Sequence, residues 1–119
     1  NQQIDDKGLS SLRKVPRLNL SGCLRITDNG LKHLKGLTSV NISNCPQFTN
    51  SGMKHLANCD FIVLRENHQV DDNGLKALRK VRSLRFYDCT RITNRGIGYL
   101  TGAQSVHHWG CPLIKEEEK

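Results

Sequence analysis

The stretch LNLSGCLRITDNGLKHL, residues 18–34, determines the fold, because the chain repeats its pattern every 22 residues. Residues 40–56, VNISNCPQFTNSGMKHL, carry the same pattern one period later. The five aligned units open near residues 4, 26, 48, 70 and 92. A period in this range is typical of a solenoid, in which each repeat buries its apolar face against its neighbours. We therefore expect one repetitive domain over residues 1–113 and a charged tail over residues 114–119.

Each unit contains two periodicities. The segment after the opening residue spaces its apolar residues as a helix does, as at Ile26, Leu31 and Leu34. The segment at residues 17–21 alternates instead, which is typical of a strand with one buried face. The expected helices begin with polar pairs that can cap them, namely Asp5-Asp6, Thr27-Asp28, Thr49-Asn50, Asp71-Asp72 and Thr93-Asn94. Five strand–helix units predict an α/β fold with a curved parallel sheet backed by short helices.

Both quoted stretches resemble the cysteine-containing subclass of leucine-rich repeats, whose units are roughly L-x-L-x-x-C-x-x-[IV]-[TS]-D-x-G-[LI]-x-x-L. The resemblance extends from Ile4 to Ile114 and implies a leucine-rich repeat solenoid with a concave sheet face. The subclass is best known from F-box substrate receptors of ubiquitin ligases, and related short arrays occur in mitochondrial assembly factors similar to factor B. The 22-residue unit is shorter than the unit usual in F-box receptors, and the sequence shows no F-box. The resemblance therefore implies substrate recognition or an assembly role without assigning ligase function.

The cysteines follow the repeat. None of the five forms a C-x-x-C pair, and Cys59 falls in an apolar column of its own. The other four share the closing column of the unit, which contains Cys23, Cys45, Asn67, Cys89 and Cys111. We expect a packed column of reduced thiols in an intracellular protein, cytoplasmic or nuclear, with mitochondria as an alternative. A Cys23–Cys45 disulfide is the other interpretation of this column, and the Asn67 amide is expected to bond loop backbone groups.

Alternation also predicts which strand residues face away from the core. The first two units place mostly serine and asparagine there, whereas the last three place Phe61, Val63, Arg65, Arg85, Tyr87, His107 and Trp109. Trp, Tyr and Arg dominate binding energy at interfaces. We expect these seven residues to bind a protein, since a shallow curve is not a small-molecule pocket. The alternative is that Tyr87 and Trp109 cap the end of the array, or that the strand register slips near His108.

The formal charge of +7 raises the alternative of an electrostatic binder of nucleic acid or anionic membrane. Lys32, Lys54 and Lys76 share one helix column, and cations there also complement a helix C-terminus and solvate the outer face. No aromatic residue is expected between these lysines, which counts against single-strand binding. A third hypothesis is self-association through the exposed ends of the array.

Enzyme chemistry finds little support in the sequence. The glycines Gly96 and Gly98 do not complete a dinucleotide motif, because Thr101 occupies the third glycine position. His107 and His108 would face opposite sides of a strand and could not share a metal ion. The sequence contains no run of about 18 apolar residues, the length that would indicate a membrane span. We therefore expect no enzyme activity, cofactor, metal or small-molecule substrate.

Overall fold

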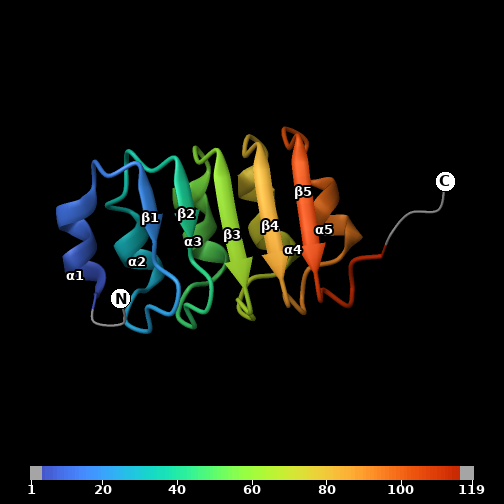
Figure 1. Ribbon diagram of the computed structural model, residues 1–119, viewed down its shortest axis with the longest axis horizontal. Coiled ribbons are helices and arrows are strands. Elements are labelled where there is room, and N and C mark those ends of the chain that lie inside the picture. The colour runs from blue at the N-terminus through green and yellow to red at the C-terminus, as the bar shows by residue number, and fades with distance from the viewer. Residues whose placement is uncertain (1–3, 116–119) are drawn as a thin grey trace.

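The computed structural model describes residues 4–115, so residues 116–119 of the expected tail lie outside the described residues. Within this range five strands alternate with five short α-helices (Figure 1). The strands are β1 Arg17–Asn19, β2 Ser39–Asn41, β3 Phe61–Arg65, β4 Ser83–Tyr87 and β5 Ser105–Trp109. The molecule measures 47 × 23 × 19 Å, and its longest axis runs across the strands (Figure 1).

All five strands are parallel and lie in chain order, β1-β2-β3-β4-β5. Arg17 pairs with Ser39 and Ser39 with Phe61, so the register advances by 22 residues at each step. The same register continues into β5, where Phe86 pairs with His108. The expected α/β fold with a parallel sheet and short helices is confirmed, and the alternative of a register slip near His108 is wrong.

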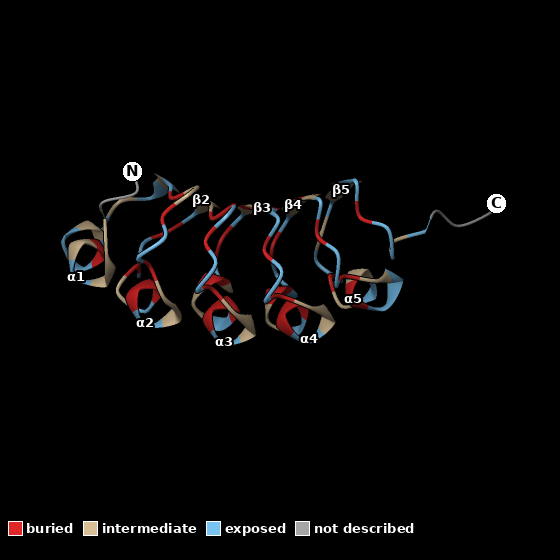
Figure 2. Ribbon diagram, turned by 90° about the horizontal axis from the view of Figure 1, so that it is seen from below, coloured by how far each residue is buried: buried red, intermediate tan, exposed pale blue. Residues whose placement is uncertain are grey.

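The helices lie along one face of the sheet, and their row bows away from it (Figure 2). They are α1 Asp6–Leu9, α2 Asp28–Leu31, α3 Asn50–Met53, α4 Asp72–Leu75 and α5 Asn94–Gly98. Three of them continue as 3-10 turns, η1 Ser10–Leu12, η2 Lys54–Leu56 and η3 Lys76–Leu78. Each α-helix begins where the polar pairs predict, because the first member of each pair is the N-cap and accepts a backbone N–H.

The core fills the space between the sheet and the helices (Figure 2). Asn67, buried in the cysteine column, donates from Nδ2 to the Ile42 carbonyl at 2.9 Å and accepts from the Arg65 N–H at 2.8 Å. One unit earlier, the Cys45 thiol lies 3.1 Å from the equivalent carbonyl of Leu20. The expectation that the Asn67 amide bonds loop backbone groups is confirmed, and thiol and amide occupy one structural position.

Neighbouring helix starts are joined by hydrogen bonds from one unit to the next. The carboxylate of Asp6 accepts the Thr27 N–H at 2.8 Å and the Thr27 hydroxyl at 2.5 Å. Asp72 accepts the same two groups of Thr93, at 2.8 and 2.5 Å. Asp28 and Thr49 make the same pair of contacts. We call this series the helix-start ladder.

The third of the four steps of the ladder, between α3 and α4, uses inverted chemistry. Asp71 takes the position that threonine holds in the other steps, and it has no hydroxyl to donate. Its partner is Asn50, whose Nδ2 donates to the Asp71 carboxylate at 2.7 Å and whose Oδ1 accepts the Asp71 N–H at 2.9 Å. The amide supplies the donor that Asp71 lacks, so the two residues compensate for each other.

The ladder also explains the glycine column. A Cβ atom added at Gly30 would lie closer than 3.0 Å to the Asp6 carboxylate, and one added at Gly96 would meet the Asp72 carboxylate in the same way. Gly98, two residues further along α5, has no neighbouring atom within 4 Å of such a Cβ. The glycine at the repeated position therefore leaves room for the side chain of the preceding unit.

Alanine substitutions within α5 test this explanation. We expect Gly96→Ala to lower the free energy of unfolding by about 2–4 kcal/mol, because Asp72 must give up its contacts with Thr93. Gly98→Ala is the matched control and should be neutral or stabilising by about 0.5–1 kcal/mol, through higher helix propensity. Urea denaturation of both variants measures the difference, and equal stabilities would contradict the steric explanation.

Introducing a second carboxylate at the inverted step gives a second prediction. Asn50→Asp places two carboxylates together without a donor and should cost about 2 kcal/mol of unfolding free energy at neutral pH. The cost should shrink as the pH falls through about 4, because a protonated carboxyl can donate again. The double variant Asn50→Asp/Asp71→Thr recreates the Asp–Thr pair of the other steps and should recover most of the loss. A double variant as unstable as Asn50→Asp in chemical denaturation would refute the inverted pairing.

Candidate functional site

The sheet face opposite the helices carries the outward side chains of the five strands and is not covered by another described element (Figure 2). We call it the open face. All seven residues expected to bind a partner lie there, on β3, β4 and β5. The register aligns Arg65 with Tyr87 and Trp109, and Val63 with Arg85 and His107. Phe61 lies in the third column, opposite Ser83.

The first of these columns forms a continuous stack across three strands. The Arg65 guanidinium lies 4.3 Å from the centre of the Tyr87 ring. The Tyr87 and Trp109 rings are stacked at 4.7 Å with an interplanar angle of 11°, and His107 stacks on Trp109 at 5.7 Å. Trp109 remains 47% exposed, so the stack presents a large apolar ring to solvent. Trp109 therefore lies along the open face, in contact with Tyr87 of the neighbouring strand and with His107 of its own strand.

The remaining predicted residues form a second contact beside the stack. The Arg85 guanidinium lies 5.3 Å from the centre of the Phe61 ring. Phe61 and Val63 are half-buried, whereas Arg85 is exposed. The structure thus brings together a cation, an aromatic ring and an aliphatic side chain from adjacent strands.

A hollow of about 360 Å³ lies in the open face, and the sequence did not indicate it. We call it the open-face hollow, and its lining residues are Ser21, Asn41, Ser43, Asn44, Phe61, Val63, Arg65, Arg85 and Tyr87. Serine and asparagine from the first two units line one part, and the predicted binding residues line the other. No carboxylate is among the lining residues. The hollow therefore combines hydrogen-bonding groups, two cations and apolar surface.

Ser43 corrects the sequence prediction, since its strand position was expected to face solvent. Its side chain is 4% exposed, and its hydroxyl has no hydrogen-bond partner among the described groups. The equivalent residue one unit earlier, Ser21, donates its hydroxyl to Asn19 Oδ1 at 2.8 Å. Asn41 Oδ1 instead accepts the backbone N–H of Ser43, at 3.0 Å, and within residues 4–115 it accepts nothing from the Ser43 hydroxyl. One buried donor therefore remains unused at the open-face hollow.

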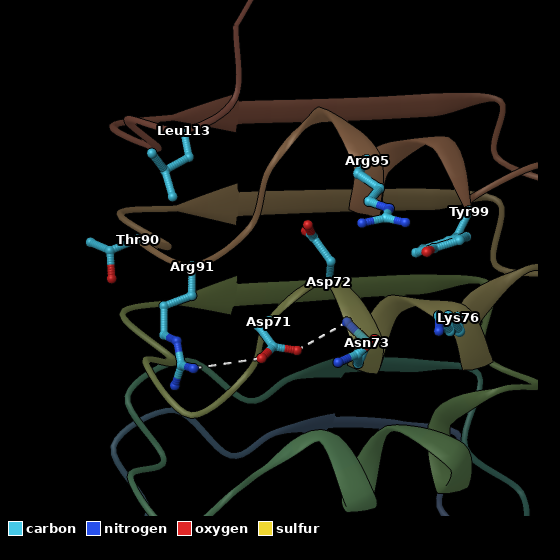
Figure 3. Close-up of a pocket in the computed structure, with 9 residues that line it drawn as sticks. All are labelled: Asp71, Asp72, Asn73, Lys76, Thr90, Arg91, Arg95, Tyr99 and Leu113. Carbon is cyan, nitrogen blue, oxygen red and sulfur yellow. Dashed lines mark hydrogen bonds and ion pairs between the residues drawn. The ribbon is translucent and has the colours of Figure 1, made fainter.

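A second cavity of about 460 Å³ lies by α4 and α5, away from the open face (Figure 3). Its acidic groups already have partners: Asp71 caps α4 by accepting the Asn73 N–H at 2.9 Å and lies 3.6 Å from the Arg91 guanidinium (Figure 3). Asp72 is a member of the helix-start ladder. Because both carboxylates serve the fold and offset the nearby cations, this cavity is a weaker candidate for binding.

The lysines of the helix side are exposed, and each is the C-cap residue of its helix, Lys32 of α2, Lys54 of α3 and Lys76 of α4. A cation there complements the negative end of the helix dipole. One aromatic ring lies beside the last of these lysines, because the Lys76 ammonium is 5.4 Å from the Tyr99 ring. Burial and the neighbouring Lys54 charge lower the pKa of His55, so this histidine adds little positive charge at neutral pH.

All five cysteines are buried and none of them forms a disulfide within residues 4–115, so the alternative of a Cys23–Cys45 disulfide is not what the structure shows. Burial raises the pKa of Cys45 and of Cys59 to about 11, and the pKa of Cys89 to about 12. The thiolate is the nucleophilic form of cysteine. These three side chains therefore act as core residues at neutral pH.

The thiols give a direct test. At pH 8 the native protein should react with iodoacetamide at least about 100-fold more slowly than the denatured protein, because the thiols are buried and protonated. The fold favours the neutral thiol, so stability should be complete below pH 9 and fall as the pH rises towards the folded pKa values of 11 to 12. Mass spectrometry of alkylated protein measures the first effect. Rapid labelling of native Cys45 or Cys89 would contradict the buried column.

Within residues 4–115, no three His, Cys, Asp or Glu side chains come together in a way that could hold a metal ion. No helix in the same residues is long and apolar enough to cross a membrane. No family model matches the chain, and no curated protein matches it. The function proposed below is therefore based on the residues and geometry of the open face.

Proposed function

We propose that this chain is a leucine-rich repeat solenoid of the cysteine-containing subclass that binds a protein partner on its open face. The constant 22-residue register of the parallel strands supports the repeat assignment. The shared position of Cys45 and Asn67, each directed at a backbone carbonyl 25 residues earlier, also supports it. The molecule acts by recognition, as a substrate-recognition or assembly adaptor module, and has no catalytic role.

The observation that carries this proposal is the exposed stack of Arg65, Tyr87 and Trp109. Aromatic side chains held against one another on adjacent strands lose little conformational freedom when a partner packs on them. Trp, Tyr and Arg are also the residues that contribute most at interfaces. The core does not require these side chains, because Leu64 and Phe86 fill the opposite face of the same strands. Five buried cysteines without a disulfide support a reducing compartment, such as the cytoplasm or the nucleus.

A second candidate function is electrostatic binding of nucleic acid or anionic membrane through the helix side. The observation that favours it is the alignment of Lys32, Lys54 and Lys76 at the ends of three neighbouring helices, all exposed. Tyr99, beside Lys76, adds one ring on which a base could stack. This function predicts an affinity that falls steeply with salt.

Affinity capture from a cell lysate, at low and at moderate salt, separates the two functions. We expect Arg85→Glu/Trp109→Ala to reduce capture of protein partners at least about tenfold, because it removes a cation and a ring of the open face. The control Lys54→Glu/Tyr99→Ala changes the same charge and also removes a ring, but on the helix side. It should leave capture unchanged, and circular dichroism should show both variants folded.

Equal capture by the open-face variant and the wild type would refute binding on the open face. Recovery of nucleic acid or lipid that is lost in salt, and lost in the helix-side variant, would establish the second function instead.

A further inference from the structure

We propose that the open-face hollow binds the carboxylate of an aspartate or glutamate side chain in an extended acidic segment of the partner. This inference rests on the proposed function and adds the chemistry of what is recognised. Three observations carry it: the charge of the open face, the unused hydroxyl of Ser43, and the contrast between Arg65, which pairs with Asp88, and Arg85, which has no carboxylate partner among residues 4–115.

The open face is cationic. Its outward strand residues include Arg17, Arg65, Arg85 and His107, and none of the outward residues of β1–β5 is Asp or Glu. Among residues 4–115, Arg85 forms no ion pair with a carboxylate, whereas Arg65 lies 3.8 Å from Asp88. A cation without a counter-charge, beside a hollow with no acidic lining residue, favours an anionic group from outside.

Ser43 adds a hydrogen-bond donor, which a specific anion-binding site has and a general positive potential lacks. Ser43 lines the hollow and its hydroxyl is buried without a partner, whereas the equivalent Ser21 hydroxyl donates to Asn19 Oδ1. A carboxylate in the hollow can accept from the exposed Arg85 guanidinium and, after rotation of the Ser43 side chain brings its hydroxyl to the surface of the hollow, from Ser43 as well. Charge-assisted hydrogen bonds of this kind are shorter and stronger than neutral ones.

The size and charge of the hollow favour a carboxylate side chain over a phosphate group. One unpaired guanidinium balances a single negative charge, while a phosphate carries nearly two. Phe61 and Val63 line the same hollow, so they can contact the methylene groups that precede a side-chain carboxylate. A volume of about 360 Å³ holds a side chain and part of its backbone, and the rest of an extended segment can lie over the Tyr87–Trp109 stack.

The ion pair between Arg65 and Asp88 limits how strongly Arg65 can bind a carboxylate from outside. Asp88 competes with an incoming carboxylate for Arg65, since both side chains are about half exposed and their atoms lie 3.8 Å apart. Asp88 has a positive φ of 53°, a conformation that asparagine adopts readily. Asp88→Asn therefore removes the competing charge while keeping the backbone, and it should tighten binding of an acidic peptide.

The test uses a fluorescein-labelled hexaglutamate peptide and fluorescence anisotropy at low ionic strength, with labelled hexaglutamine as the uncharged control. Hexaglutamate should bind at least about tenfold more tightly than hexaglutamine, because each bound carboxylate makes charge-assisted hydrogen bonds. Arg85→Gln should weaken hexaglutamate binding about tenfold and Ser43→Ala about fivefold. Asp88→Asn should strengthen it about threefold, a gain that misfolding cannot produce.

Two matched controls separate a site from net charge. Lys32→Gln removes the same charge as Arg85→Gln but on the helix side, and Ser10→Ala removes a hydroxyl outside the hollow that already donates to the Lys7 carbonyl. Both should change the affinity less than about twofold, since neither touches the hollow. Equal losses in Lys32→Gln and Arg85→Gln would overturn the proposal, as would equal binding of the two peptides or no binding of hexaglutamate. Tighter binding of inorganic phosphate or of oligothymidine at the hollow would also overturn it.

Failure of this inference can be told apart from failure of the proposed function. If partner capture depends on Arg85 and Trp109 but hexaglutamate does not compete for it, the open face binds protein and the acidic chemistry is wrong. If capture is also insensitive to Arg85→Glu/Trp109→Ala, both proposals fail.

Discussion

The side chain at the first position of each helix holds the start of the next helix in place. Asp6 accepts both the backbone N–H and the hydroxyl of Thr27, and Asp28 and Asp72 repeat this contact with the following threonine. The carboxylate that makes the contact lies where a Cβ atom of the next helix would otherwise be. Glycine, cap residue and first-turn acid are therefore three consequences of one hydrogen-bonded contact between units.

This contact sets the spacing of the open face as well. Because every helix start is tied to the next by a side chain that accepts a backbone N–H 21 residues later, each strand meets its neighbour in the same 22-residue register. Residues of one column then lie side by side across the sheet, which is why Arg65, Tyr87 and Trp109 can stack. The chemistry of the open face can thus vary without disturbing the core, since core and face occupy alternate positions of each strand.

The period alone was enough to predict the helix caps, the buried thiols and the common face of the seven open-face residues. Each of these depends only on where a residue stands within its unit. Contacts between units were not predictable in this way, because they depend on side-chain conformation and on the neighbour's chemistry. The burial of Ser43, the placement of Tyr99 beside Lys76 and the exchange of donor and acceptor between Asn50 and Asp71 belong to this second class.

The inverted step at Asn50 and Asp71 also determines where one exchangeable unit ends and the next begins. Excising residues 50–71 would leave Thr49 followed by Asp72, and Asp28 would still face a threonine hydroxyl. Excising residues 49–70, a segment of the same length, would instead leave Asp28 facing the carboxylate of Asp71. The natural boundary therefore falls between the cap residue and the first residue of the helix, and duplication or loss of units in such arrays should favour breakpoints at that bond.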